Sequence, residues 1–165
     1  MKIPRLAAQT RIDTPLGPLT LAASTRGLAL AWFDAQAHRT DEVDAPEQPE
    51  NPHLATAARE FSEYFAGTRR AFSVALDAQG TLFQQQVWQA LRGIRMGALS
   101  TYGDIASQVG RPDAARAVGA AVGRNPISII VPCHRVVGRD GSLTGYAGGL
   151  PRKEALLRLE GALLV

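Results

Sequence analysis

Apolar and polar positions in the first third of the chain follow patterns typical of β-strands. Two largely apolar runs, residues 19–23 and 28–33, are separated by Arg26 and Gly27, a pair that favours a short turn. Residues 71–76 alternate between apolar and polar positions and predict a further strand. These segments indicate a small antiparallel sheet.

Residues 53–66 carry apolar side chains at helical spacing, and Gly67 marks the end of this predicted helix. The preceding segment, residues 41–52, contains five acidic residues and three prolines and predicts an exposed loop. His38 and His53 lie in or beside this loop. Since neither has a second ligand at helical spacing, we expect both to face solvent rather than a metal. The first half is thus a sheet with one covering helix.

The second half begins where the composition changes, at residues 77–80, and we place a domain boundary there, between residues 1–80 and 81–165. Thr81 can cap a helix whose apolar stripe continues to Ile94. The rest of this half carries further helical patterns, so we expect an α+β protein with a mostly helical carboxy-terminal domain.

Two short helices are predicted in tandem after residue 100. Thr101 and Asp104 resemble a capping box that opens a helix over residues 102–109. Pro112 suits the first position of a second helix, which Gly123 ends. A helix, a turn of about three residues and a second helix have the spacing of a helix-turn-helix.

The second of these helices consists almost entirely of alanine and glycine, with Arg116 near its middle. A helix that reads the major groove presents several long polar side chains, and this one presents a single arginine. Small side chains suit either burial in a core or close approach to a narrower minor groove. Arg116 has no acid four residues away, which favours exposure, and such a side chain could fill the space left by an extruded base.

The single cysteine, Cys133, stands between Pro132 and His134. The apolar run at 127–131 predicts a buried strand that Pro132 ends, and a glycine-rich segment, residues 138–149, follows. Buried cysteines commonly serve only as small core residues. An adjacent imidazole, however, offers a base that can generate thiolate, so this pair is a candidate nucleophilic site.

Length and composition narrow the class of protein. With 165 residues the chain can form one full-sized domain or two small ones. No stretch approaches the roughly 18 apolar residues of a membrane span, and the first residues lack the apolar core of a signal peptide. One cysteine excludes an internal disulfide framework, argues against a zinc cluster and predicts a cytoplasmic location, where a free thiol stays reduced.

Charge is distributed unevenly between the two halves. Residues 1–80 contain 8 Lys and Arg against 10 Asp and Glu, whereas residues 81–165 contain 10 against 5. This asymmetry predicts a polyanionic partner for the second half, with a solvated basic face as the alternative.

The motifs of the second half resemble those of the O6-alkylguanine-DNA alkyltransferases, most closely the stand-alone bacterial members. The resemblance runs from Thr81 to Glu160. It rests on Phe83-Gln84-Gln85-Gln86-Val87-Trp88, Tyr102-Gly103-Asp104-Ile105-Ala106, Ala115-Arg116-Ala117-Val118-Gly119, Asn125-Pro126, Pro132-Cys133-His134-Arg135-Val136, Gly145-Tyr146-Ala147-Gly148-Gly149 and Lys153-Glu154. The first half shows only a general resemblance to the ribonuclease-H-like domain that precedes the alkyltransferase domain in this family.

The resemblance implies a set of catalytic residues. Cys133 would accept the alkyl group, while His134, acting through a water, and Glu160 would draw off the thiol proton. A base oriented by a carboxylate is expected to raise the thiolate fraction at neutral pH. Asn125 would be a hinge that ties the recognition region to the cysteine. The other catalytic residues implied are Tyr102, which would turn the 3′ phosphate and donate to guanine N3, and Lys153, near the leaving base.

The resemblance also implies residues that bind DNA or the damaged base. Arg116 would take the place of the flipped base, Tyr146 would wall the pocket, and the Ala147 amide would face guanine O6. The carbonyls of Cys133 and Val136 would face the exocyclic amine. The remaining positions implied to contact DNA or substrate are Ala115, Ala117, Gly119, Arg135 and Gly148.

The chain departs from the family pattern at three places. Arg95-Met96 replaces the usual Pro-x in the turn after Ile94, which predicts a less rigid and more basic entry to the helix-turn-helix. Ala147 stands where some relatives carry serine, which changes pocket size. The amino-terminal zinc site of some relatives has no counterpart, because no second cysteine exists.

The implied activity is direct repair of O6-alkylguanine, and of O4-alkylthymine, by a single irreversible transfer that needs no metal or cofactor. The implied partner is double-stranded DNA bound from the minor groove by a monomer, with cooperative binding left open and no role for a membrane. Two other classes are considered. One is a non-catalytic DNA-binding module. The other is a cysteine hydrolase, for which adjacent Cys and His side chains at a strand end would point to opposite faces.

Overall fold

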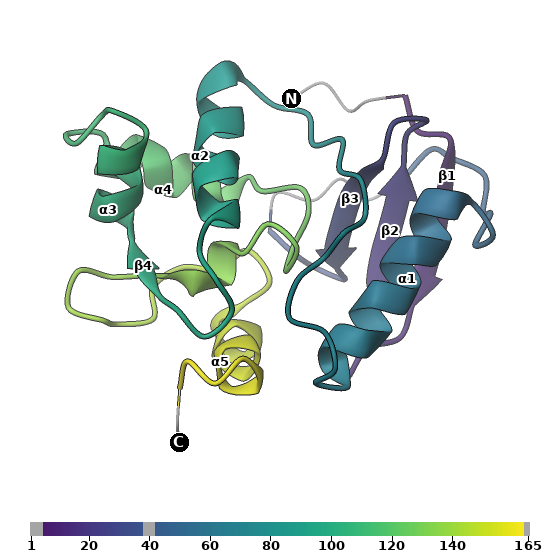
Figure 1. Ribbon diagram of the computed structural model, residues 1–165. Helices are drawn as coiled ribbons and strands as arrows, with labels where there is room; N and C mark the ends of the chain where they lie inside the picture. Colours follow the sequence, from purple (N-terminus) through teal and green to yellow (C-terminus); the bar gives the residue numbers. More distant parts are fainter. Residues whose placement is uncertain (1–4, 38–41, 164–165) are drawn as a thin grey trace.

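The computed structural model describes residues 5–37 and 42–163 and confirms an α+β fold with two halves side by side (Figure 1). Strands β1 (Ala8–Ile12), β2 (Leu19–Ala23) and β3 (Leu28–Phe33) form an antiparallel sheet in that order, with α1 (Pro52–Phe65) against one face. The strands predicted over residues 19–23 and 28–33 are confirmed. The sequence did not predict β1, because its largely polar residues suit an edge strand, which pairs with β2 on one side and meets only a single bridge, from Gln9 to Glu47, on the other.

Helix α1 confirms the helix predicted over residues 53–66. The Asn51 side chain accepts hydrogen bonds from the amides of His53 and Leu54, and Pro52 occupies the favoured first position. The predicted acidic loop has neither helix nor strand from residue 42 to residue 51, apart from a single bridge at Glu47. Asp41 and His38 lie outside the described residues. His53 is partly exposed, with Nε2 3.3 Å from the Thr25 carbonyl oxygen.

The strand predicted over residues 71–76 is absent, and only an isolated bridge joins Leu76 to Leu28. The buried Glu60 carboxylate accepts hydrogen bonds from the amides of Ser73 and Val74 and from the Ser73 hydroxyl. A side chain therefore takes the donors that a ladder would need, and the segment remains irregular despite its alternating pattern.

The helical half begins as its capping signals predict. Helix α2 (Leu82–Arg92) starts with a capping box in which Thr81 and Gln84 exchange hydrogen bonds. Helix α3 (Tyr102–Gln108) starts where the Thr101 hydroxyl accepts from the Asp104 amide. These caps depend only on residues three apart in the chain, which is why the pattern identifies them.

The second helix of the pair, α4 (Ala115–Gly123), ends at Gly123 as predicted but starts later than Pro112. Residues 112–114 form a turn, and the Ala114 amide donates to the Arg111 carbonyl. Arg116 therefore lies in the first turn of α4, not near its middle. The helices α3 and α4 pack together beside α2, as in a helix-turn-helix (Figure 1).

The strand predicted over residues 127–131 is wrong, although these residues are buried as expected. Asn125 Oδ1 accepts from the Ile127 amide, Nδ2 donates to the Val131 carbonyl, and the Val131 amide donates to the Ile127 carbonyl. These bonds close the segment into a loop in which Ile129 has φ 73°. Cys133 accordingly begins a short 3₁₀ helix, η1 (Cys133–Arg135), and does not follow a strand.

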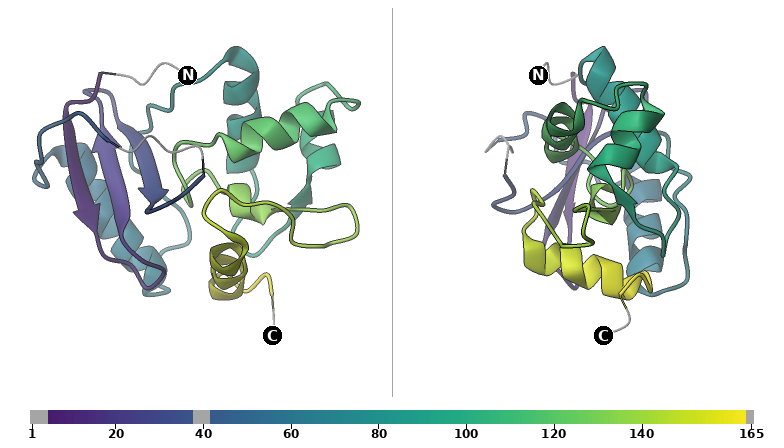
Figure 2. Two further views of the ribbon diagram at one scale, coloured as in Figure 1. Left: turned by 180° about the vertical axis from the view of Figure 1, so that it is seen from behind. Right: turned by 90° about the vertical axis from the view of Figure 1, so that its left-hand side faces the viewer.

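The end of the chain returns beside η1. Strand β5 (Val136–Val137) pairs in parallel with β4 (Ser100–Thr101), and α5 (Leu150–Leu159) follows the glycine-rich loop. The two halves share one continuous apolar core. Figure 2 shows, from behind, the loops around residue 130 lying between the sheet and the helices. The amide of Ala31 in β3 donates to the Pro126 carbonyl, and the Ser128 amide donates back to Ala31.

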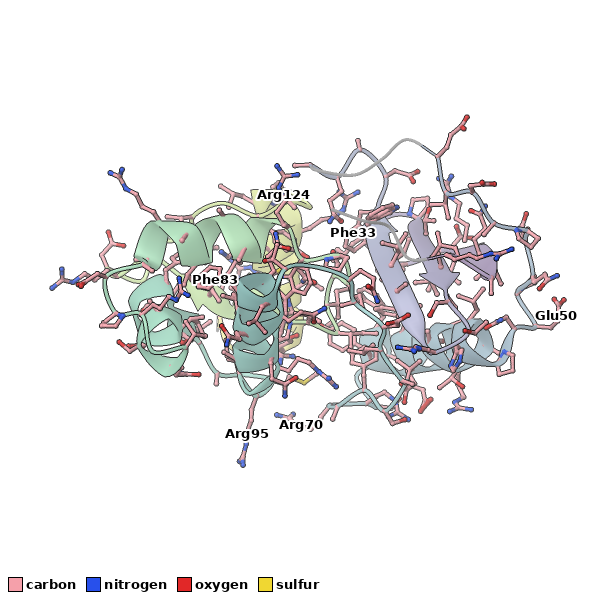
Figure 3. The ribbon with its side chains drawn as sticks, turned by 90° about the horizontal axis from the view of Figure 1, so that it is seen from above. Phe33, Glu50, Arg70, Phe83, Arg95 and Arg124 are labelled. Carbon is pink, nitrogen blue, oxygen red and sulfur yellow. The ribbon has the colours of Figure 1, made fainter. Side chains whose placement is uncertain are left out.

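The uneven charge of the sequence is visible in the fold. Figure 3 shows Arg95 and Arg124 projecting from the helical half, while Glu50 lies at the far end of the sheet-and-helix half. Among the helices of the described residues, none is long and apolar enough to cross a membrane.

Candidate active site

Cys133 borders a cavity of about 400 Å³ that opens between the helix-turn-helix and the glycine-rich loop. Its side chain is 5% exposed. The cavity brings together residues from five parts of the chain: Ala37, Tyr102, Gly119, Val122, Gly123, Cys133, Thr144, Gly145, Tyr146 and Ala147. A thiol at the wall of a cavity can contact a bound ligand. A cysteine that only fills the core has no need to border a cavity.

Asn125 holds the thiol and the loop before it. Its Nδ2 lies 3.2 Å from Cys133 Sγ and 2.7 Å from the Val131 carbonyl oxygen, and its Oδ1 accepts from the Ile127 amide at 2.9 Å. Asn125 lies two residues after the end of α4, so one side chain connects the end of the helix-turn-helix to the cysteine.

His134 and Glu160 form a fully buried pair. His134 Nε2 lies 2.7 Å from Glu160 Oε2, which stands at the end of α5. His134 Nδ1 has no hydrogen-bond partner within the described residues. The ring is therefore oriented by the carboxylate at one nitrogen and retains the other for a proton.

Two further groups bind the Glu160 carboxylate. Arg135 donates from Nε to Oε1 at 2.8 Å and from Nη2 to Oε2 at 3.0 Å. The Tyr64 hydroxyl, from α1 in the other half, donates to Oε2 at 2.6 Å. Sequence reasoning missed Tyr64 because it lies 96 residues from Glu160 in a helix whose apolar pattern explains it as core. No local signal identifies this contact.

Burial and hydrogen bonding determine the protonation of the site. Burial raises the pKa of the Cys133 thiol, although Asn125 and Lys153 oppose the shift. Burial also lowers the pKa of His134, despite the opposing effect of Glu160. Burial alone would raise the pKa of Glu160, but hydrogen bonds from His134 and Arg135 lower it to about 2. The resting site thus holds a thiol, a neutral imidazole and a carboxylate, and the thiolate expected at neutral pH is not favoured.

Lys153 fastens the glycine-rich loop to the segment after η1. Its buried Nζ donates to the carbonyls of Val136 at 2.6 Å and Thr144 at 2.7 Å, with Gly145 at 3.4 Å. Burial lowers the pKa of Lys153 to about 8, with Cys133 opposing the shift. The Val136 carbonyl, predicted to face a guanine amine, already accepts from Lys153. One lone pair remains for a further donor.

Two predicted DNA contacts are placed differently by the structure. Arg135 is buried, with its guanidinium on Glu160 and on the Ile94 carbonyl, so its role is internal. Gly148 is also buried, and its carbonyl accepts from Arg152. Sequence proximity to Cys133 and to the glycine-rich loop does not reveal which side of the backbone faces outward.

The other predicted contacts lie in or next to the cavity. Tyr102, Gly119, Tyr146 and Ala147 line it, and the Tyr102 hydroxyl lies 3.5 Å from Thr144 Oγ1. In α4 the lining residues belong to the carboxy-terminal half, whereas Ala115, Arg116 and Ala117 are exposed at the other end of the helix. The helix thus presents an open surface that leads toward Cys133.

Comparison with known proteins identifies relatives over almost the whole chain. The family model "6-O-methylguanine DNA methyltransferase, ribonuclease-like domain" matches residues 8–78, and "6-O-methylguanine DNA methyltransferase, DNA binding domain" matches residues 82–162. The methylated-DNA–protein-cysteine methyltransferase of Mycobacterium tuberculosis is 48% identical over 155 residues, 90% of this chain and 89% of that protein. The enzyme of the same name from Salmonella typhimurium is 46% identical over 166 residues, covering 95% and 97%.

Solved structures show the same similarity in three dimensions. The crystal structure of Mycobacterium tuberculosis OGT in complex with DNA superimposes with a TM-score of 0.87 at 48% identity, covering 94% of each chain.

Proposed function

The chain belongs to the methylated-DNA–protein-cysteine methyltransferases, which repair O6-methylguanine in DNA by direct transfer to a cysteine, and we propose that Cys133 is the acceptor. The observation that supports this assignment most strongly is the position of the only cysteine of the chain, at the wall of the cavity and next to the His134–Glu160 pair. A cysteine hydrolase, the other enzyme class considered, has no support among these relatives.

The reaction follows from the protonation of the site. The thiol proton passes through a water to Nδ1 of the neutral His134, whose imidazolium form is stabilised by Glu160. The sulfur then attacks the alkyl carbon, the S–C bond forms, and the C–O6 bond of guanine breaks. The departing guanine regains one proton, so overall the thiol hydrogen is exchanged for the alkyl group. Because a thioether does not return to thiol, each molecule reacts once, without metal or cofactor.

The cavity can admit a base only after it has left the duplex. Tyr102 and Tyr146 line the cavity, which supports a role for both in binding this base. In the proposed complex Tyr102 donates to N3 and Tyr146 forms a wall of the pocket. The Ala147 amide would face O6. The roughly 400 Å³ available is compatible with O4-alkylthymine as a second substrate.

DNA would be bound by α4 from the minor groove, with Arg116 replacing the extruded base in the stack. The support is the exposure of Arg116 and of the small residues Ala115 and Ala117 on one helix that leads to the cavity.

We also propose a monomeric state on DNA, a cytoplasmic location that keeps the thiol reduced, and a domain boundary at residue 80.

The decisive experiment is intact-protein mass spectrometry after incubation with an oligonucleotide that contains one O6-methylguanine. The wild type should gain one methyl group, about 14 mass units, with one equivalent of guanine restored in the DNA. Cys133→Ser should bind the same DNA and gain no mass. Methylation of the Cys133→Ser protein, or more than one turnover by the wild type, would contradict the proposal.

A further inference from the structure

The proton-accepting pair of the active site is contacted by a residue from the other half of the protein. Tyr64 of α1 donates its hydroxyl to Glu160 Oε2 at 2.6 Å, and His134 Nε2 binds the same oxygen at 2.7 Å. Tyr64 is 1% exposed, so solvent does not compete for this hydrogen bond.

Packing explains the Tyr64 ring but not its hydroxyl. The ring contacts Phe65 and Phe72, with centroids 5.1 and 5.6 Å away, and a phenylalanine would make the same contacts. Within the described residues the only hydrogen bond of the hydroxyl is the one to Glu160. Burial, reinforced by Glu160, raises the pKa of Tyr64, so the group stays protonated and acts as a donor.

The charge on Glu160 Oε2 is therefore shared between several donors. The other titratable and charged groups that bind or influence the His134–Glu160 pair come from the elements around it: Tyr64 of α1, Arg135 of η1, Tyr146 of the glycine-rich loop and Lys153 of α5. A donor on Oε2 draws electron density from the atom that His134 also binds. The carboxylate then stabilises an imidazolium less strongly, and the imidazole stays neutral before reaction.

We propose that Tyr64 is a positioning residue that sets the proton affinity of His134 through Glu160. The hydroxyl keeps the imidazole ready to accept the thiol proton, and it makes the amino-terminal half part of the reaction machinery. This inference rests on the proposed transfer to Cys133.

The test is the pH dependence of the single-turnover methyl-transfer rate in wild type and Tyr64→Phe. Removing the hydroxyl leaves Oε2 to His134 and Arg135, so His134 should bind a proton more readily. The acid limb of the rate profile should move to higher pH by about half to one pH unit, the effect of one ordinary hydrogen bond, because the hydroxyl acts on His134 only through Glu160. Nitrogen NMR of the histidine rings should show the same upward shift for one of the three histidines.

Ser73→Ala is the matched control, because it removes another hydroxyl that donates at 2.6 Å to a buried carboxylate of the same half, Glu60. It should leave the acid limb where the wild type has it. A second variant carries 3-fluorotyrosine at position 64 and at no other position, which keeps the fold. Its phenol hydroxyl donates more strongly to Glu160, so the acid limb of its rate profile should move to lower pH.

Three outcomes are distinguishable. An unchanged acid limb in both position-64 variants, or an equal shift in Ser73→Ala, overturns the role of Tyr64. Wild-type protein that never gains a methyl group overturns the proposed function itself. Opposite shifts for phenylalanine and fluorotyrosine establish the inference.

Discussion

At the scale of single residues, the site is characterised by a thiol that is buried and protonated at rest. Burial raises the pKa of Cys133 and lowers that of His134, so neither group carries charge before DNA arrives. In the proposed mechanism, proton transfer then accompanies the reaction. Burial also protects the thiol from oxidants, which react with exposed thiolates. The cost is that the thiol must be held in place, which Asn125 does.

Asn125→Ala should remove three hydrogen bonds, to the Val131 carbonyl, the Cys133 sulfur and the Ile127 amide. We expect the free energy of unfolding to fall by about 2 to 3 kcal/mol, because buried polar groups lose their partners. Urea unfolding would measure this loss of stability. The methyl-transfer rate would measure the effect of losing the hydrogen bond to the Cys133 sulfur.

Asn125→Asp offers the informative contrast. It keeps the acceptor for the Ile127 amide but places a carboxylate beside the sulfur, so it should slow transfer more than its effect on stability would indicate. Wild-type transfer rates in both variants would show that Asn125 does not position the thiol.

At the scale of elements, α4 starts later than its sequence pattern predicts and carries mostly small side chains. It begins only at Ala115, so Arg116 projects from the exposed end, while Gly119, Val122 and Gly123 border the cavity. A Cβ at Gly119 would lie 3.8 Å from the Tyr102 ring, an ordinary contact. Packing therefore does not require glycine at position 119, and we propose that the small side chain leaves room for the approach of DNA.

Ala117→Glu places a negative charge on the exposed surface of α4 without burying it. We expect DNA affinity to fall at least about tenfold through repulsion of phosphates, with the melting temperature unchanged within error. Fluorescence anisotropy with a labelled duplex at fixed salt would measure the change. Gln89→Glu, on the exposed side of α2, makes the same charge change away from the proposed interface. Equal losses in both variants would argue against DNA binding by α4.

At the scale of the whole molecule, the two halves are joined most closely around the active site. The Ala37 amide donates to the Ala147 carbonyl, and the Ser128 hydroxyl donates to Gln36. Tyr64 binds Glu160 across the same boundary. The amino-terminal half thus contacts the cavity wall, the loop before the cysteine and the His134–Glu160 pair. It therefore helps to position the active site.

Acid should destabilise the whole protein in two stages. The folded-state pKa of His134 is lowered from 6.5, so its stabilising effect is present above pH 6.5 and declines as the pH falls below that value. The pKa of Glu160 is lowered from 4.5 to about 2, which contributes up to about 3 kcal/mol that is lost as the pH falls from 4.5 toward 2.

Urea unfolding at pH 7, 5.5 and 3 would measure this dependence. Glu160→Gln should be less stable at pH 7 and should show a smaller loss between pH 4.5 and 3 than the wild type. A wild-type stability that is constant from pH 7 to pH 3 would contradict the pKa shifts of this pair.

The amino-acid sequence alone determined those features that depend on neighbours in the chain. Asn51, Thr81 and Thr101 cap helices through amides two or three residues away, and Gly123 ends α4. The Pro-Cys-His-Arg-Val motif identified the nucleophile candidate and the family for the same reason, because the residues that define it are consecutive in the chain.

Only the tertiary structure decided how distant groups share hydrogen bonds. Glu60 accepts from the amides of Ser73 and Val74, which a strand over residues 71–76 would need. Asn125 likewise binds the Ile127 amide and the Val131 carbonyl, which a strand over residues 127–131 would need. The inward direction of Arg135 and the contact of Tyr64 with Glu160 also depend on packing. An apolar pattern reports that a segment is buried, but the partners of its polar groups are fixed only when segments far apart in the chain come together.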